Sequence, residues 1–130
     1  MINLKRVGYW REDPEPPSML SAVLAFARGE LVGHRFADAL ANLPWPGDLV
    51  DKTWDSGARL LVTQYVNDER FKHIGYLGYS HCRLCPLPTN GTSDYSDGVY
   101  VWPEGFGHYI EAHGVRPPAE FVAHVIARLQ

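Results

Sequence analysis

Two cysteines and two histidines in the C-terminal half of the chain are the side chains best suited to chemistry. Two residues separate Cys82 from Cys85 and four separate His108 from His113, so the pattern is C-x2-C followed by H-x4-H. Thiolate sulfur and neutral imidazole nitrogen are preferred ligands of Zn²⁺, and both spacings occur in structural zinc sites. The sequence therefore predicts these four residues as candidate zinc ligands. His81, next to the first cysteine, is a candidate substitute ligand.

The expected secondary structure limits how these side chains can meet. Successive strand residues point to opposite faces, so a turn must begin at Cys82 if both sulfurs are to face one ion. On a helix, two side chains that are five positions apart point in directions that differ by about 140°. This phase puts His113 on the core side with Phe106 and Ile110, and leaves His108 on the other side. We therefore expect a three-ligand site or a purely structural cluster in preference to a four-ligand site.

Two other interpretations of the same residues stay open. The cysteines can be half-buried free thiols beside ordinary histidines, because a single C-x2-C is only a moderate pattern. Alternatively, one cysteine is the nucleophile of an enzyme and His108 or His113 is its base. A thioredoxin-like redox site is disfavoured, since Pro86 and Pro88 follow the cysteines where that site would need a helix.

The residues around the cysteines predict a small sheet. Residues 71–84 and 95–102 are rich in Tyr, Val, Ile and Trp, which favours strands. The loop between them contains two prolines and Asn90-Gly91 and is long enough to join antiparallel neighbours. Asp97-Gly98 is a second turn signal, which can instead divide the second strand. Residues 3–10 are expected to form a short first strand.

Helices are expected on both sides of this sheet. They are predicted at residues 19–28, at 34–43, from Asp48 to about Asn67 with a break near Gly57, from Pro103 to His113, and at 119–129. Asp55 or Ser56 would cap the part after the break, and Gly114 would cap the helix that carries the histidines. The predicted fold is α+β, with a small antiparallel sheet around residues 71–102 and helices before and after it. Residues 1–130 are expected to form one domain.

Composition narrows the classes of function. The chain has 130 residues, a formal net charge of −3 and basic residues that are scattered, so we expect no nucleic-acid partner. No apolar run approaches the roughly 20 residues of a membrane span, and no signal-peptide pattern is present. A cytoplasmic location is the expectation. In that reducing compartment the two cysteines would not form a structural disulfide.

The last third of the chain also resembles a family of small uncharacterised bacterial proteins. The pattern of that family is G-x-S-x-C-R-x-C, then N-G, then T-D-G-x-Y-V-W-P-E-G, then H-Y-V, a second His and R-L-P. The matching positions are Gly78, Ser80, Cys82, Arg83, Cys85, Asn90-Gly91, Asp97-Gly98, residues 100–105, His108-Tyr109, His113 and Arg116. The resemblance implies that the cysteines and histidines share one site, and it implies no particular activity. Pro86 stands where the family tends to have Gly, which would weaken zinc binding because proline has no N–H to donate to sulfur.

The predicted function is a non-enzymatic module that binds another protein and contains a structural zinc site. Trp45, in a Pro-rich stretch, and Trp102 are candidate contact residues for that partner. The alternative function is the enzyme with a cysteine nucleophile and a histidine base.

Overall fold

The computed structural model describes residues 4–11, 27–28, 43–75 and 81–130. The elements in chain order are β1 Lys5–Arg6, the 3-10 turn η1 Pro46–Leu49, α3 Ser56–Val66, the 3-10 turn η2 Glu69–Phe71, β2 Lys72–Gly75, β3 Ser93–Ser96, β4 Tyr100–Pro103, α4 Phe106–His113 and α5 Ala119–Arg128. The predicted helices at 19–28 and 34–43, apart from their last residues, and residues 76–80 of the predicted strand lie outside the described part.

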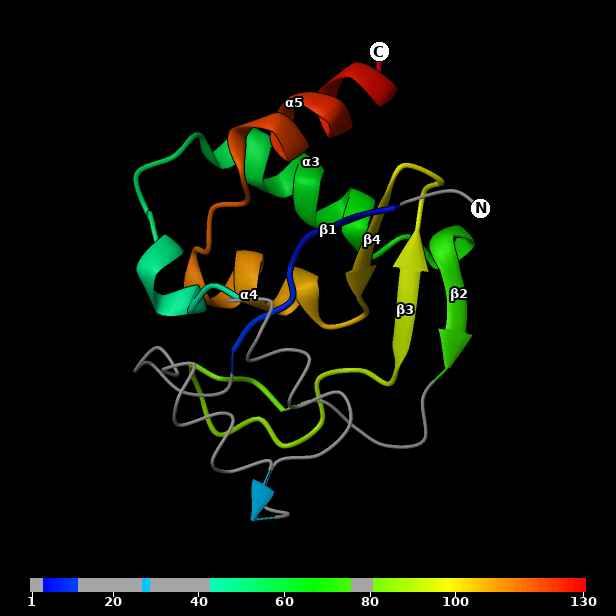
Figure 1. Cartoon of the computed structure of the whole chain (residues 1–130). Coiled ribbons are helices and arrows are strands. Elements are labelled where there is room, and N and C mark those ends of the chain that lie inside the picture. The colour runs from blue at the N-terminus through cyan, green and yellow to red at the C-terminus, as the bar shows by residue number, and fades with distance from the viewer. Residues whose placement is uncertain (1–3, 12–26, 29–42, 76–80) are drawn as a thin grey trace.

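The strands form a four-stranded sheet in the order β1-β4-β3-β2. β2 pairs antiparallel with β3, and β3 pairs antiparallel with β4, as predicted for a chain that returns through loops. β1 pairs parallel with β4, along Lys5↔Tyr100 and Arg6↔Val101. The α+β class is confirmed, but the sheet is mixed. It is not purely antiparallel because the edge strand β1, which comes from the distant N-terminal part of the chain, pairs parallel with β4 (Figure 1).

The turn at Asp97-Gly98 divides the predicted strand 95–102 into parts of β3 and β4. Gly98 has φ +92°, a left-handed conformation that favours glycine. The Asp97 carboxylate accepts hydrogen bonds from the backbone N–H groups of Val99 and Tyr100, at 2.9 and 2.8 Å. The hairpin register places Tyr95 opposite Trp102. The alternative in which this turn splits the strand is therefore the correct one.

The helix before the sheet is shorter than predicted. No α-helix begins at Asp48, where the described chain forms only the 3-10 turn η1 after Pro46. α3 begins at Ser56, and the Asp55 side chain caps it by accepting a hydrogen bond from the Ala58 N–H at 2.7 Å. The cap at Asp55 and the helix that follows it are thus confirmed, whereas the helix predicted from Asp48 up to that cap is wrong.

The helices after the sheet follow the prediction closely. α4 starts at Phe106, three residues later than predicted, because Pro103 is the last residue of β4. It ends at His113, and Gly114 follows in a left-handed conformation with φ +69°. The predicted cap at Gly114 is thus confirmed. α5 covers residues 119–128 and was predicted to within one residue. Among the described helices, none has the length and apolar character required to cross a membrane.

The core lies between one face of the sheet and the helices α3, α4 and α5 (Figure 1). Tyr100 and Trp102 alternate with half-buried neighbours on β4 and pack against Phe121 of α5, with ring centroids 4.9 and 5.9 Å apart. Trp102 is fully buried, and its Nε1–H donates to the Val66 carbonyl at 3.0 Å. Its assignment as a partner-contact residue is therefore wrong, because it has no surface to offer. Trp45 is half-buried.

Candidate metal centre

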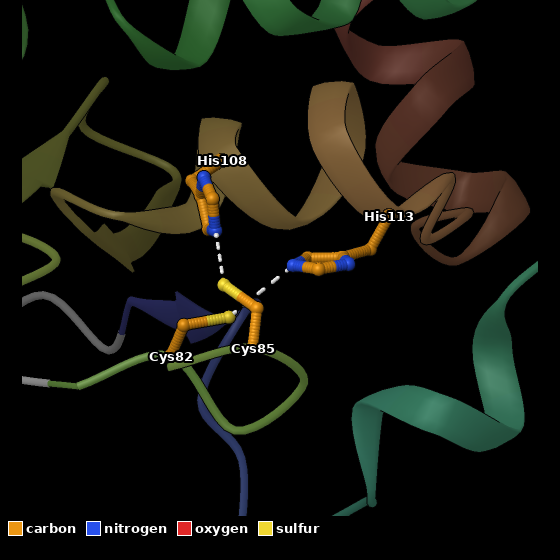
Figure 2. Close-up of side chains that lie close together, drawn as sticks. All are labelled: Cys82, Cys85, His108 and His113. Atoms are coloured by element: carbon orange, nitrogen blue, oxygen red, sulfur yellow. Dashed lines mark hydrogen bonds between the residues drawn. The ribbon is translucent and has the colours of Figure 1, made fainter. Parts of the chain in front are cut away.

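The structure brings Cys82, Cys85, His108 and His113 together. One ligand atom from each lies within 4.8 Å of all the others. The Cys82 Sγ is 3.4 Å from the His113 Nε2, and the Cys85 Sγ is 3.4 Å from the His108 Nε2. Figure 2 shows both sulfurs pointing from a loop toward the two imidazole rings, which descend from α4. The group can hold a metal ion.

The helical-phase argument for a three-ligand site is wrong. Both imidazole rings lie on the side of α4 that faces the cysteines (Figure 2), and their centroids are only 5.0 Å apart. A phase difference fixes only the direction in which each side chain leaves the backbone, and rotation about the side-chain bonds then sets where the imidazole ring lies. His113 is half-buried, as His108 is, and does not belong to the core with Phe106 and Ile110.

Residues 81–91, called the Cys turn below, present the two sulfurs. The Cys82 N–H donates to the Leu87 carbonyl at 3.1 Å, so the chain reverses where the sequence requires a turn. The Leu84 N–H donates to the Cys82 Sγ at 3.4 Å. Donors of this kind stabilise a metal-bound thiolate. The first sulfur therefore has a backbone donor although Pro86 provides none.

Two contacts tie the Cys turn to α4. The Tyr109 hydroxyl accepts a hydrogen bond from the Arg83 N–H at 2.8 Å. At the other end of the turn, the buried Asn90 side chain donates to the Gly105 carbonyl at 3.1 Å. Gly105 is required there, because a Cβ atom would lie 2.1 Å from the Asn90 carbonyl oxygen. The turn is thus fixed against the helix by side chains that do not belong to the group.

His81, the predicted substitute ligand, lies outside the group of four. Its side chain is exposed, and its backbone carbonyl accepts hydrogen bonds from Arg83 Nη1 and the Tyr109 hydroxyl at 2.8 and 3.5 Å. The residue helps to shape the turn through its backbone.

Burial shifts the pKa of two members of the group, Cys82 and His108, when no metal is bound. It raises the pKa of the Cys82 thiol, against the opposing effect of the Leu84 N–H. It lowers the pKa of His108, and the neighbouring His113 lowers it further. A neutral thiol and a neutral imidazole are thus favoured in this place. Metal binding would displace the thiol proton, whereas the imidazole is already in its ligand form.

A second polar cluster, centred on Asp97, was missed from the sequence. The Asp97 side chain is 0% exposed and lies 2.7 Å from His124 Nε2 and 2.6 Å from the Tyr65 hydroxyl, which donates to it. Burial alone would raise the pKa of Asp97, but hydrogen bonds from Tyr100 N–H, Tyr65 and His124 together lower it to about 2. The cluster ties α3, the β3–β4 turn and α5 together. Its members come from three distant segments, so no local motif indicates it.

Comparisons of the chain with protein-family models, curated proteins and solved structures give no match. The resemblance to small bacterial proteins stays a prediction. The function of the Cys2His2 group is therefore inferred from its own geometry.

Proposed function

We propose that the protein is a zinc-binding domain in which Cys82, Cys85, His108 and His113 hold one structural Zn²⁺. With bonds of about 2.3 Å to sulfur and about 2.0 Å to nitrogen, two ligands of a tetrahedral zinc lie about 3.5 Å apart. Both Sγ–Nε2 distances in the group are 3.4 Å. The observation that supports the proposal is that two separate Sγ–Nε2 pairs lie at the distance expected between neighbouring ligands of a tetrahedral zinc.

The donor set favours zinc over other ions. Two sulfurs and two nitrogens suit tetrahedral Zn²⁺, whereas Ca²⁺ and Mg²⁺ require oxygen ligands, which this group does not contain. Iron–sulfur clusters are mostly held by four cysteines. Four protein ligands also fill a tetrahedral zinc and leave no position for water or substrate, which is the arrangement of structural sites. The metal would therefore stabilise and would not catalyse.

The ion would connect two segments that are distant in sequence. Both sulfurs come from the Cys turn and both nitrogens come from α4, with ligand pairs 31 and 23 residues apart. Because the site exists only in the folded chain, the binding free energy of the ion would stabilise the folded state and hold the turn against the helix. The metal would reinforce the contacts that Tyr109 and Asn90 already make.

The biological role in this proposal is the presentation of a surface to a protein partner. Trp45 is half-buried and lies beside Gly47, and a Cβ on Gly47 would lie 2.5 Å from the Trp45 ring nitrogen and 3.6 Å from a Leu84 methyl group. An aromatic side chain with exposed surface thus borders the Cys turn. Such residues are enriched in protein interfaces.

One observation favours the alternative of a cysteine enzyme. Cys85 is half-buried, and its Sγ lies 3.4 Å from His108 Nε2, which is within the distance between a nucleophile and its base. This pair needs a metal-free site. Metal content therefore separates the two functions.

The test is metal analysis of the full chain purified from zinc-containing medium without chelator. We expect one zinc per chain, and Co²⁺ substitution is expected to give the sulfur-to-metal absorption of a tetrahedral site. The variants C82S and H108Q should lose the metal, whereas H81Q, which changes an exposed neighbour outside the group, should keep it. Metal-free protein whose Cys85 reacts with iodoacetamide much faster than free thiol would overturn the proposal and favour the enzyme.

A further inference from the structure

The division of the ligands between two segments has a chemical consequence. Both sulfurs belong to the Cys turn, and their Sγ atoms lie within 4.8 Å of each other. Figure 2 shows the two sulfurs side by side below the imidazole rings. Cys85 is half-buried, whereas Cys82 is 3% exposed. Cys85 is therefore the more accessible of the two residues to a small reagent from solvent, and the Cys82 sulfur is close enough to react with it next.

We propose that this site is a thiol–disulfide switch, in which a peroxide joins Cys82 to Cys85 and the Zn²⁺ is released. The inference rests on the proposed function, because it concerns the regulation of the same zinc site. The oxidant is a hydroperoxide such as hydrogen peroxide.

The reaction is balanced in two steps. The Cys85 thiolate attacks one peroxide oxygen, an S–O bond forms as the O–O bond breaks, and the departing hydroxide takes up a proton from solvent to form water. The Cys82 thiolate then attacks the sulfur of the Cys85 sulfenic acid, the S–S bond forms as the S–O bond breaks, and the second hydroxide also takes up a solvent proton and leaves as water. Two thiolates lose two electrons in total, and the peroxide gains them. Zinc leaves as Zn²⁺ without a change of oxidation state.

The Cys turn can accommodate the bond. A disulfide requires an S–S distance of about 2.05 Å. The sulfurs start no more than 4.8 Å apart on a chain that is already reversed by the hydrogen bond from Cys82 N–H to the Leu87 carbonyl. The approach is therefore local to one turn and does not require α4 to move.

Loss of both sulfurs would release the metal without unfolding the domain. His108 and His113 would be the only remaining members of the group, and two ligands do not make a structural zinc site. The core consists mainly of sheet and helix side chains, and Cys82 is its only fully buried member from the Cys turn. The contacts of Arg83 with Tyr109 and of Asn90 with Gly105 do not involve sulfur. The turn would loosen while the core stays folded, which makes the change reversible.

The experiment is a hydrogen peroxide titration of the full zinc-loaded chain. A colorimetric zinc chelator, a thiol reagent and intact mass spectrometry are followed together, and circular dichroism reports the fold. We expect one zinc released for every two thiols lost, a mass lower by two hydrogens, unchanged secondary structure and recovery of zinc binding after dithiothreitol. Zinc retained with intact thiols, while glutathione in the same tube is oxidised, would overturn the inference. Addition of oxygen to the cysteines or crosslinking between chains would overturn it as well.

Two further samples separate this inference from the proposed function. Metal-free wild-type protein is oxidised in parallel, so that thiol pairing is measured without zinc. C85S retains only the buried thiol and is expected to form no internal disulfide. Purified protein that binds no zinc overturns the proposed function and the release together. Protein that binds zinc but forms no disulfide overturns the switch alone.

Discussion

The aromatic core and the Cys turn are stabilised in different ways. The core, between the sheet and the helices, contains the largest fully buried side chains of the described chain, among them Trp102, Phe106 and Phe121. In the Cys turn, residues 81–91, only Cys82 and Asn90 are buried. Leu84, Cys85 and Leu87 pack against the edge of the core as partly buried residues. The core depends on apolar area, whereas the turn depends on a few polar contacts and, in our proposal, on a metal.

This difference separates global from local stability. A segment that buries little apolar surface cannot offset the entropy of ordering its own backbone, so it requires a crosslink or strong hydrogen bonds. Damage to the core should therefore unfold the whole domain. Damage to the metal centre should release the turn while the core persists.

The largest effect is expected in the core, from W102A. Removal of a fully buried tryptophan leaves a cavity and an unpaired Val66 carbonyl, and such changes cost about 3–5 kcal/mol in free energy of unfolding. Urea unfolding followed by circular dichroism gives this value. W45A, at a half-buried position, is the control and should cost much less. Equal losses in both variants would show that the core does not dominate stability.

Removal of the metal is expected to have a smaller and more local effect. Zinc at a free concentration 100 times its dissociation constant stabilises the folded state by about 2.7 kcal/mol, and chelation or H108Q should remove that contribution. Hydrogen exchange should show faster exchange at the Cys82, Arg83 and Leu84 amides and no change at Val125 in the core helix α5. H81Q is the matched control. Global unfolding on chelation would contradict the independence of the core.

The sequence predicted well those features that depend on local chemistry. Gly114 marked the end of α4, Asp55 marked the start of α3, and the cysteine and histidine spacings marked the residues that the structure brings together. In each case the physical cause lies within a few residues: a left-handed cap, a side-chain cap, or a turn between two ligands.

The failures have their causes in tertiary structure. β1 lies beside β4 through pairing across more than 90 residues, which no local pattern shows. Asp97 and His124 are in contact although 27 residues separate them in the sequence. The Asp97-Gly98 pair predicts only a turn, and it does not show that the Asp97 carboxylate is also the buried partner of His124. Both histidines meet the cysteines although helical phase separates them by about 140°, because the Cys turn lies next to α4, and the local sequence does not show that placement.

Acid should act on the core through Asp97. The folded pKa of about 2 lies below the ordinary value of 3.8, so the carboxylate contributes stability above pH 3.8. This contribution is lost as the pH falls from 3.8 through 2. Its size is about 2 kcal/mol for a carboxylate with no exposed surface. Urea unfolding of wild type and D97N at pH 7 and near pH 2 measures it, and the gap between the two should narrow in acid.

The control for the Asp97 variant is D51N. It changes a partly exposed carboxylate that forms an ion pair with Arg116 at 3.1 Å. Hydrogen bonds from Thr53 lower the pKa of Asp51, but solvent screens this site, so its variant should show little pH-dependent difference from wild type. An equal pH response in both variants would contradict the special position of the buried carboxylate.

The smallest change, Y109F, tests the boundary between the two regions. The Tyr109 ring belongs to the core, where it packs against Trp10 with centroids 5.4 Å apart, while its hydroxyl accepts from the Arg83 N–H of the Cys turn. Removal of that hydroxyl should cost about 1 kcal/mol of stability. Because the hydroxyl positions the turn, zinc affinity should also fall by about 10-fold, measured by competition with a chromophoric chelator. Y65F is the matched control: it removes a hydroxyl that donates to Asp97, which is not a member of the Cys2His2 group, so it should lower stability and leave zinc affinity unchanged. If both variants bind zinc as wild type does, the turn is positioned by its ligands alone, and the preorganisation attributed to Tyr109 is wrong.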